Sequence, residues 1–172
     1  MQTIEIEIKS PEGANLNTES NMASTLVKND LHITFHVKTT SPKILPDDLP
    51  ALLNYISGII MNRGGIAMET GGMPDHIHIL TSLPKTICLS DYVRDIKSGS
   101  SKWLKTRGTH YTHFEWQEGY GAFSVSPSLL DKTTKYIQGQ AEHHKKRTFA
   151  EEYKMFLEAS HIEYDERYIL SD

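Results

Sequence analysis

Apolar and polar residues alternate in two short segments of the chain. Residues 31–37 read Leu-His-Ile-Thr-Phe-His-Val, and residues 76–81 read His-Ile-His-Ile-Leu-Thr. A period of two is typical of a strand with one buried face. A third strand is expected over residues 66–70, and a Gly-rich turn over residues 71–75 would join it to the strand at 76–81 as a hairpin.

Helices are predicted where apolar residues recur three and four positions apart. The first such segment runs up to Gly64-Gly65 and carries the stripe Leu49, Leu52, Leu53, Ile56, Ile59 and Ile60. The second begins at Ser90 and carries the stripe Val93, Ile96, Trp103 and Leu104. A third helix is expected over residues 131–145, and a capping box at residues 148–151 opens a fourth.

Two further short strands are expected over residues 114–116 and 122–125. The order of elements then predicts an α+β protein with a ferredoxin-like (split βαβ) fold, an antiparallel sheet with helices on one face, to which C-terminal helices are added. Residues 1–21 are polar and are expected to form a flexible extension, whereas residues 22–172 are expected to form a single domain. Because this fold hosts many functions, the function must be argued from a site.

The composition excludes several classes of protein. In a chain of 172 residues, 38% are hydrophobic and 23% are charged, which argues against wholesale disorder. No apolar run approaches the roughly 18 residues of a membrane span, and the N-terminus does not resemble a signal peptide. Cys88 is the only cysteine, which excludes an intramolecular disulfide and a Cys-rich zinc site, and we expect it to be buried. These features favour a cytoplasmic protein.

The net charge of −4 argues weakly against a nucleic-acid partner, but the charge is unevenly placed. Residues 85–110 hold six basic residues against two acidic ones, and residues 131–147 hold five against two. Such segments can follow a phosphate backbone. Solvated helix faces explain the charge equally well.

Two histidines supply the first candidate chemistry. His76 and His78 are two apart on a predicted strand, so both side chains leave the same face. A pair of imidazoles can form half of a divalent-metal site. Taken alone, two surface histidines on an exposed sheet face explain the pattern more simply.

The predicted third helix adds a tyrosine and a glutamine. Tyr136 and Gln140 are four apart, so they lie one above the other on a helix. The amide oxygen of Gln140 can complete a metal site, and a tyrosine can act as a covalent nucleophile. By itself, the spacing also fits an ordinary amphipathic helix with a half-buried tyrosine.

Together these motifs resemble the single-tyrosine HUH transposases of the smallest bacterial insertion sequences and their relatives associated with repetitive extragenic palindromes. The resemblance rests on the H-hydrophobe-H motif at residues 76–78, the Y-x-x-x-Q motif at residues 136–140, and the segments 98–103 and 114–126. These elements follow the order and spacing of the family between Leu31 and Lys146. The N-terminal extension and the acidic tail, residues 148–172, depart from it.

The resemblance implies a transposase that acts on hairpin ends in single-stranded DNA. A Mg²⁺ or Mn²⁺ ion, held by His76, His78 and Gln140, would polarise the scissile phosphate. Tyr136 would attack that phosphate, leaving a 5′-phosphotyrosine and a free 3′-OH, and rejoining would need no ATP. Ligand softness alone would favour Zn²⁺ or Cu²⁺ at a pair of imidazoles, so the choice of metal follows the family.

The family also implies a homodimer in which the tyrosine helix can serve the histidine pair of the partner. Six basic residues are candidates for contacts with the DNA backbone, whose strength would fall with salt: Lys97, Lys102, Lys105, Arg107, Lys132 and Lys135.

Two alternatives remain open at this stage. Two-histidine phosphoesterases use a pair of H-x-T/S motifs and no metal, and residues 32–34 and 110–112 match that motif. This interpretation leaves His78, Tyr136 and Gln140 without roles. The other alternative is a domesticated hairpin-binding protein that has kept the fold without transposition.

Overall fold

Four strands form one antiparallel sheet in the computed structural model, which describes residues 25–143 and 148–165. The strand order is β2-β3-β1-β4, with the bounds β1 Asp30–His36, β2 Ile66–Met73, β3 His76–Ser82 and β4 Gly121–Ser124. The helices are α1 Leu49–Asn62, α2 Leu89–Lys105, α3 Leu130–Gln138, α4 Gln140–His143 and α5 Phe149–Ala159, with short 3₁₀ turns at Thr109–Tyr111 and Pro127–Leu129. Among the described residues, no helix has the length and apolar character of a membrane span.

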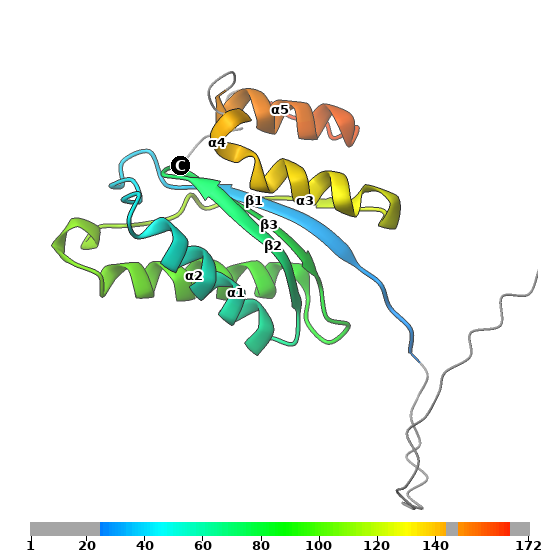
Figure 1. Ribbon diagram of the computed structural model, residues 1–172, viewed down its shortest axis with the longest axis horizontal. Helices are drawn as coiled ribbons and strands as arrows, with labels where there is room; N and C mark the ends of the chain where they lie inside the picture. Colours follow the sequence, from blue (N-terminus) through cyan, green and yellow to red (C-terminus); the bar gives the residue numbers. More distant parts are fainter. Residues whose placement is uncertain (1–24, 144–147, 166–172) are drawn as a thin grey trace, which may run out of the picture.

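Helices α1 and α2 cover one face of the sheet, and α3, α4 and α5 lie over the other (Figure 1). The first face holds the main core, because the apolar residues of the alternating strands point there. Its fully buried members include Ile33, Phe35, Ile77 and Ile79 from the strands and Leu52, Ile56 and Ile96 from the helices. This arrangement confirms the predicted α+β, ferredoxin-like antiparallel sheet.

The second face of the sheet is polar, yet it is also buried. The β1–β3 register pairs Thr34 with His78 and His36 with His76, so these side chains share that face. Together with His32 they are all less than a tenth exposed. The C-terminal helices therefore shield a row of imidazoles from water.

Strand β2 is longer than the sequence predicts. It continues through Gly71 and Gly72, which pair with His78 and Ile77 of β3, so the turn is confined to Pro74 and Asp75. The glycines allow β2 to pass close to its neighbours and do not form a turn. A Cβ at Gly72 would lie 2.3 Å from the backbone oxygen of His76.

The strand predicted over residues 114–116 is wrong. Only an isolated bridge joins Val37 to Trp116, and Phe114 and Trp116 instead pack into the main core. The indole Nε1–H of Trp116 donates to Ser100 Oγ at 3.0 Å, which anchors this segment to α2. The segment alternates like a strand because it runs beside the end of β1, where the N–H of Gln117 donates to His36 O and the N–H of Lys38 donates to Glu115 O, both at 3.0 Å.

The third helix is shorter than predicted. Helix α3 ends at Gln138. The next residue, Gly139, caps it through an N–H that donates to Lys135 O at 3.0 Å, and α4 then begins at Gln140. Residues 144 and 145, the predicted end of that helix, lie outside the described part of the chain, as do residues 1–21.

The predicted capping box is confirmed at the start of α5. Thr148 Oγ1 accepts from the N–H of Glu151, whose carboxylate accepts from the N–H of Thr148. Cys88, which we expected to be buried, is exposed, because it precedes the first turn of α2 at the surface.

Candidate active site

The histidine pair lies on β3 beneath the C-terminal helices. His76 and His78 are both 0% exposed, and their ring centroids are 5.1 Å apart. His76 Nδ1 donates to Asp75 Oδ1 at 2.8 Å, and His78 Nδ1 shares a 3.0 Å hydrogen bond with His32 Nε2. Each ring is thus held through one nitrogen, which leaves Nε2 as the nitrogen for a metal.

The two anchoring groups differ in charge. The hydrogen bond from His76 holds the pKa of Asp75 far below its usual value, helped by Lys43 and opposed by burial. Burial lowers the pKa of His32 to about 4, so that ring is neutral at pH 7. His76 is therefore supported by a carboxylate and His78 by a neutral imidazole.

Two further groups join the pair from the C-terminal helices. Gln140, at the start of α4, places Oε1 3.3 Å from His76 Nε2. Glu152, in the first turn of α5, contributes a carboxylate oxygen, and the candidate ligand atoms of Glu152, His76 and His78 all lie within 4.8 Å of one another. Gln140 is 2% exposed and Glu152 is 4% exposed. Imidazole, amide and carboxylate donors in this arrangement fit a divalent metal ion.

Sequence reasoning missed Glu152. The sequence shows only that Glu152 follows Glu151 in the first turn of the helix that begins at the capping box. The sequence pattern assigned this acidic pair to helix capping and to an acidic tail. The folding of α5 back over the sheet brings Glu152 to the histidines, and nothing in the local pattern encodes that step.

Tyr136 lies at the same place. Its ring meets His78 edge-on at a centroid distance of 5.7 Å, and its hydroxyl donates to Glu152 Oε2 at 2.8 Å. Helix α3 reaches this close to the sheet because β2 offers a glycine there: a Cβ at Gly71 would lie 2.7 Å from Ile137 O. The structure thus brings together all four residues that the sequence suggested for catalysis and metal binding: Tyr136, His76, His78 and Gln140.

Helix α5 closes the site. Phe149 stacks on His76 with ring centroids 4.5 Å apart, and Phe156 meets His32 edge-on at 4.9 Å. The side chains of the candidate ligands are buried. In the described conformation α5 therefore covers them.

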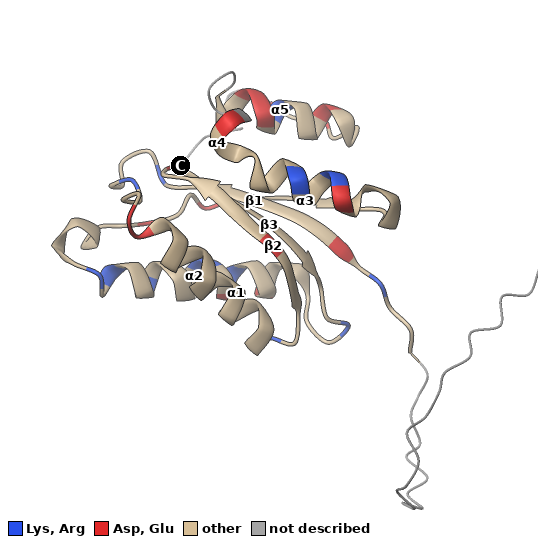
Figure 2. Ribbon diagram, viewed as in Figure 1, with Lys and Arg blue, Asp and Glu red and all other residues tan. Residues whose placement is uncertain are grey.

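The candidate DNA contacts divide between the two faces of the sheet. Lys132 and Lys135 are exposed on α3, on the side of the histidines, whereas the other four belong to α2 or follow it, on the opposite face (Figure 2). Of these, Lys102 and Lys105 are exposed. Contact of any of these residues with DNA stays a prediction.

The other two basic residues already make contacts within the fold. Lys97 Nζ donates to the carbonyl oxygens of Gln117, Glu118 and Gly119 at 2.6, 3.0 and 2.8 Å. Burial lowers the pKa of Lys97 to about 8, against the opposing charge of Glu118. Arg107 pairs with Asp48 at 3.1 Å.

The paired H-x-T motifs do not meet. His32 lies under α5, whereas His110 lies in the 3₁₀ turn beside α2, exposed, with Nε2 2.9 Å from Lys43 O. The next residue, Tyr111, is buried in the main core on the α2 side of the sheet. The two histidines therefore belong to opposite faces, which argues against a two-histidine phosphoesterase.

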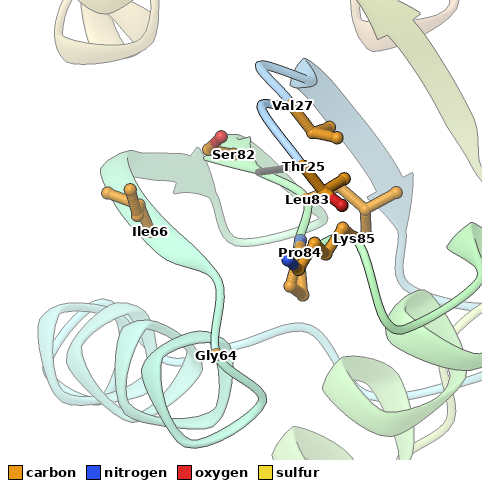
Figure 3. Close-up of a pocket in the computed structure, with 8 residues that line it drawn as sticks. All are labelled: Thr25, Val27, Gly64, Ile66, Ser82, Leu83, Pro84 and Lys85. Carbon is orange, nitrogen blue, oxygen red and sulfur yellow. The ribbon is translucent and has the colours of Figure 1, made fainter. Parts of the chain in front are cut away.

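A hollow of about 190 Å³ lies at the end of the sheet where β3 finishes, away from His76 (Figure 3). It is bounded mainly by apolar or small side chains, and Lys85 is its only charged residue: Thr25, Val27, Gly64, Ile66, Ser82, Leu83, Pro84 and Lys85. Because Ser82 ends β3 and His76 begins it, the hollow is separate from the histidine pair.

Comparison with known proteins identifies the family. Residues 25–140, more than half of the chain, match the family model described as "Transposase IS200 like". The chain belongs to the IS200-like transposase family. The matched segment of this IS200-like transposase contains the histidine pair, Tyr136 and Gln140, and ends before α5 and Glu152. Transposase function is thereby supported.

Solved structures show the same fold. A candidate transposase from Deinococcus radiodurans R1 is 19% identical, with a TM-score of 0.54, over 68% of this chain and 94% of that one. A REP-associated tyrosine transposase, solved bound to a REP hairpin, is 16% identical, with a TM-score of 0.53, over 69% of this chain and 70% of that one. No curated protein matches the chain significantly.

Proposed function

We propose that this IS200-like transposase cleaves and rejoins single-stranded DNA at hairpin ends through a 5′-phosphotyrosine at Tyr136. The observation that carries the proposal is the convergence of Tyr136, Gln140 and the histidine pair, from three separate elements, on one buried site. A protein that only bound hairpins would have no use for a tyrosine hydroxyl held beside candidate metal ligands. This argument favours the enzyme over the domesticated binding protein.

His76, His78 and Gln140, with Glu152 beside them, would hold a Mg²⁺ or Mn²⁺ ion. When bound, such an ion would polarise the scissile phosphate. The hydrogen bonds at Nδ1 orient the two rings so that Nε2 would be the ligand atom of each, and the amide oxygen of Gln140 would add a hard donor.

Tyr136 supplies the nucleophilic oxygen. Its O–H bond breaks, and Glu152 Oε2, which already accepts its hydrogen bond at 2.8 Å, is placed to take the proton. A bond forms between the phenolic oxygen and phosphorus while the bond from phosphorus to the 3′ oxygen breaks, and that oxygen leaves as a 3′-OH after protonation. Because the number of phosphodiester bonds is conserved, the reverse attack by a 3′-OH restores the strand without ATP.

The proposed partners are DNA hairpins and a second copy of the chain. The hairpin bound to the REP-associated transposase supports the first. The homodimer follows from the family resemblance alone. In the described chain α3 packs on its own β2 and β3, and a swapped tyrosine helix would make the same contacts with the sheet of a partner.

The test uses overlapping labelled single-stranded oligonucleotides that cover the DNA flanking the gene. We expect at least one oligonucleotide, containing an imperfect palindrome, to migrate with the protein in SDS when Mn²⁺ is present. The complementary strand serves as the control. Binding without any adduct, across the whole set, would favour the hairpin-binding alternative.

Substituting Gly71 tests whether the fit of α3 on the sheet matters for cleavage. A Cβ at Gly71 meets the backbone of Ile137, the neighbour of Tyr136, so strand and helix must separate. We expect Gly71→Ala to lower the free energy of unfolding by about 1–3 kcal/mol. A shift of about 1 Å at the nucleophile should slow adduct formation about 100-fold.

Gly58→Ala is the matched control for this substitution. A Cβ at Gly58, within α1, meets nothing within 4 Å, and alanine favours a helix over glycine by about 1 kcal/mol. This variant should keep the wild-type cleavage rate. A Gly71→Ala protein that cleaves at the wild-type rate would show that the close fit of α3 is not needed.

A further inference from the structure

His32 is buried in the site, and the proposed chemistry gives it no role. It lies on β1, where the period of two places it on the same face as Thr34, and Thr34 pairs with His78 across the sheet. His32 is 3% exposed, and its Nε2 atom lies 3.0 Å from His78 Nδ1. It is therefore the direct neighbour of a candidate metal ligand.

The hydrogen bond between the two rings restricts where the protons lie. A bond between two imidazole nitrogens needs one proton, so one ring donates and the other accepts. If His78 uses Nε2 for a metal, its proton must be on Nδ1, and His32 must accept through an Nε2 without a proton. The proton of His32 then lies on its own Nδ1.

The packing around His32 holds it in this orientation. Its ring meets Phe156 of α5 at 4.9 Å and Tyr136 of α3 at 6.1 Å, both edge-on, and Phe123 of β4 at 6.3 Å. Asp75 supports His76 through the same nitrogen, Nδ1, so both candidate ligands are anchored alike. Ligating histidines are generally oriented by such a partner on the second nitrogen.

We infer that His32 is a positioning residue: its Nε2 atom accepts the Nδ1 proton of His78 and thereby commits the Nε2 atom of His78 to metal binding. The role of His32 in metal binding rests on the proposed function, whereas the hydrogen bond between His32 and His78 does not. The proton on His78 can be located in the metal-free protein, without any DNA.

The first measurement is a long-range ¹H–¹⁵N correlation spectrum of the ¹⁵N-labelled, metal-free full chain. We expect His78 to show a protonated Nδ1 and an unprotonated Nε2. In His32→Phe, which keeps an aromatic ring against Phe156 but removes the acceptor, this preference should be lost. A proton on Nε2 of His78 in the wild-type protein would overturn the inference.

The second measurement is Mn²⁺ binding, followed by the electron paramagnetic resonance of the free ion. Loss of a partner outside the ligand shell typically weakens metal binding about 10–100-fold, and we expect this for His32→Phe. His32→Gln can place an amide oxygen near the position of Nε2, so it should recover most of the affinity. Unchanged Mn²⁺ affinity in His32→Phe would also overturn the inference.

The glutamine variant separates positioning from packing. If His32→Phe does not fold, the wild-type spectrum and the His32→Gln protein still decide the question, because an accepting amide must preserve the Nδ1 proton of His78. A wild-type protein that shows this proton and binds Mn²⁺, but cleaves no DNA, would remove the proposed function and support the role of His32.

Discussion

Replacing Tyr136 with phenylalanine is expected to reduce the covalent DNA–protein adduct to background while hairpin binding persists. The variant lacks the hydroxyl oxygen that would bond to phosphorus in the proposed mechanism, and its ring still fills the space between His78 and Phe156. The substitution also removes a hydrogen bond to the buried carboxylate of Glu152, which should lower the free energy of unfolding by about 1–3 kcal/mol. Adduct is measured by SDS gel, and binding by mobility shift.

Tyr120→Phe is the matched control for the nucleophile. Tyr120 is partly buried beside Lys97 of α2, on the other side of the sheet from Tyr136. Its substitution should leave the adduct at the wild-type level. If the adduct persisted in Tyr136→Phe and disappeared in Tyr120→Phe, the nucleophile would have to be reassigned.

Replacing His76 with phenylalanine is expected to abolish metal-dependent cleavage. Phenylalanine preserves the stacking on Phe149, and Asp75 keeps its ion pair with Lys43 at 3.0 Å, so the fold should survive. Even partners outside the ligand shell are worth about 10–100-fold in metal affinity, so loss of a ligand should exceed that range. Cleavage rate and Mn²⁺ affinity are measured together.

Metal removal supplies the complementary experiment. Wild-type protein in excess EDTA should form no adduct, and added Mn²⁺ should restore it. His110→Phe is the control variant, because His110 is exposed on the other side of the sheet and should not matter. Equal cleavage by the wild-type protein with and without EDTA would contradict a role for metal.

The sequence predicted the sheet well because the strands alternate and their apolar residues face one core. His76 and His78 could be placed on a common face for the same reason. The end of β2 was placed too early, because Gly71 and Gly72 have no side chains and so cannot contribute to the alternation of apolar and polar residues. Such errors affect element boundaries and leave the topology intact.

The closure of the site could not be predicted. The polar residues of β1 and β3 have the pattern of a solvent-facing surface, and only tertiary packing of α3 to α5 buries them. Glu152 was missed for this reason, since its place beside the histidines depends on how α5 docks. His32 was noticed only as part of an H-x-T motif, because its pairing with His78 is a contact across two strands.

Under the proposed function, the docking of α5 has a thermodynamic consequence for DNA affinity. A DNA strand that reaches the candidate ligands would bind only the fraction of molecules in which α5 has left the sheet. If that fraction is about one in a hundred, the apparent dissociation constant is about 100-fold weaker than the intrinsic one. Leu157, which packs on Phe123, would then influence affinity without touching DNA. Since α5 lies beyond the matched residues 25–140, changes in its docking would then alter the affinity for a hairpin without altering any part of the matched transposase segment.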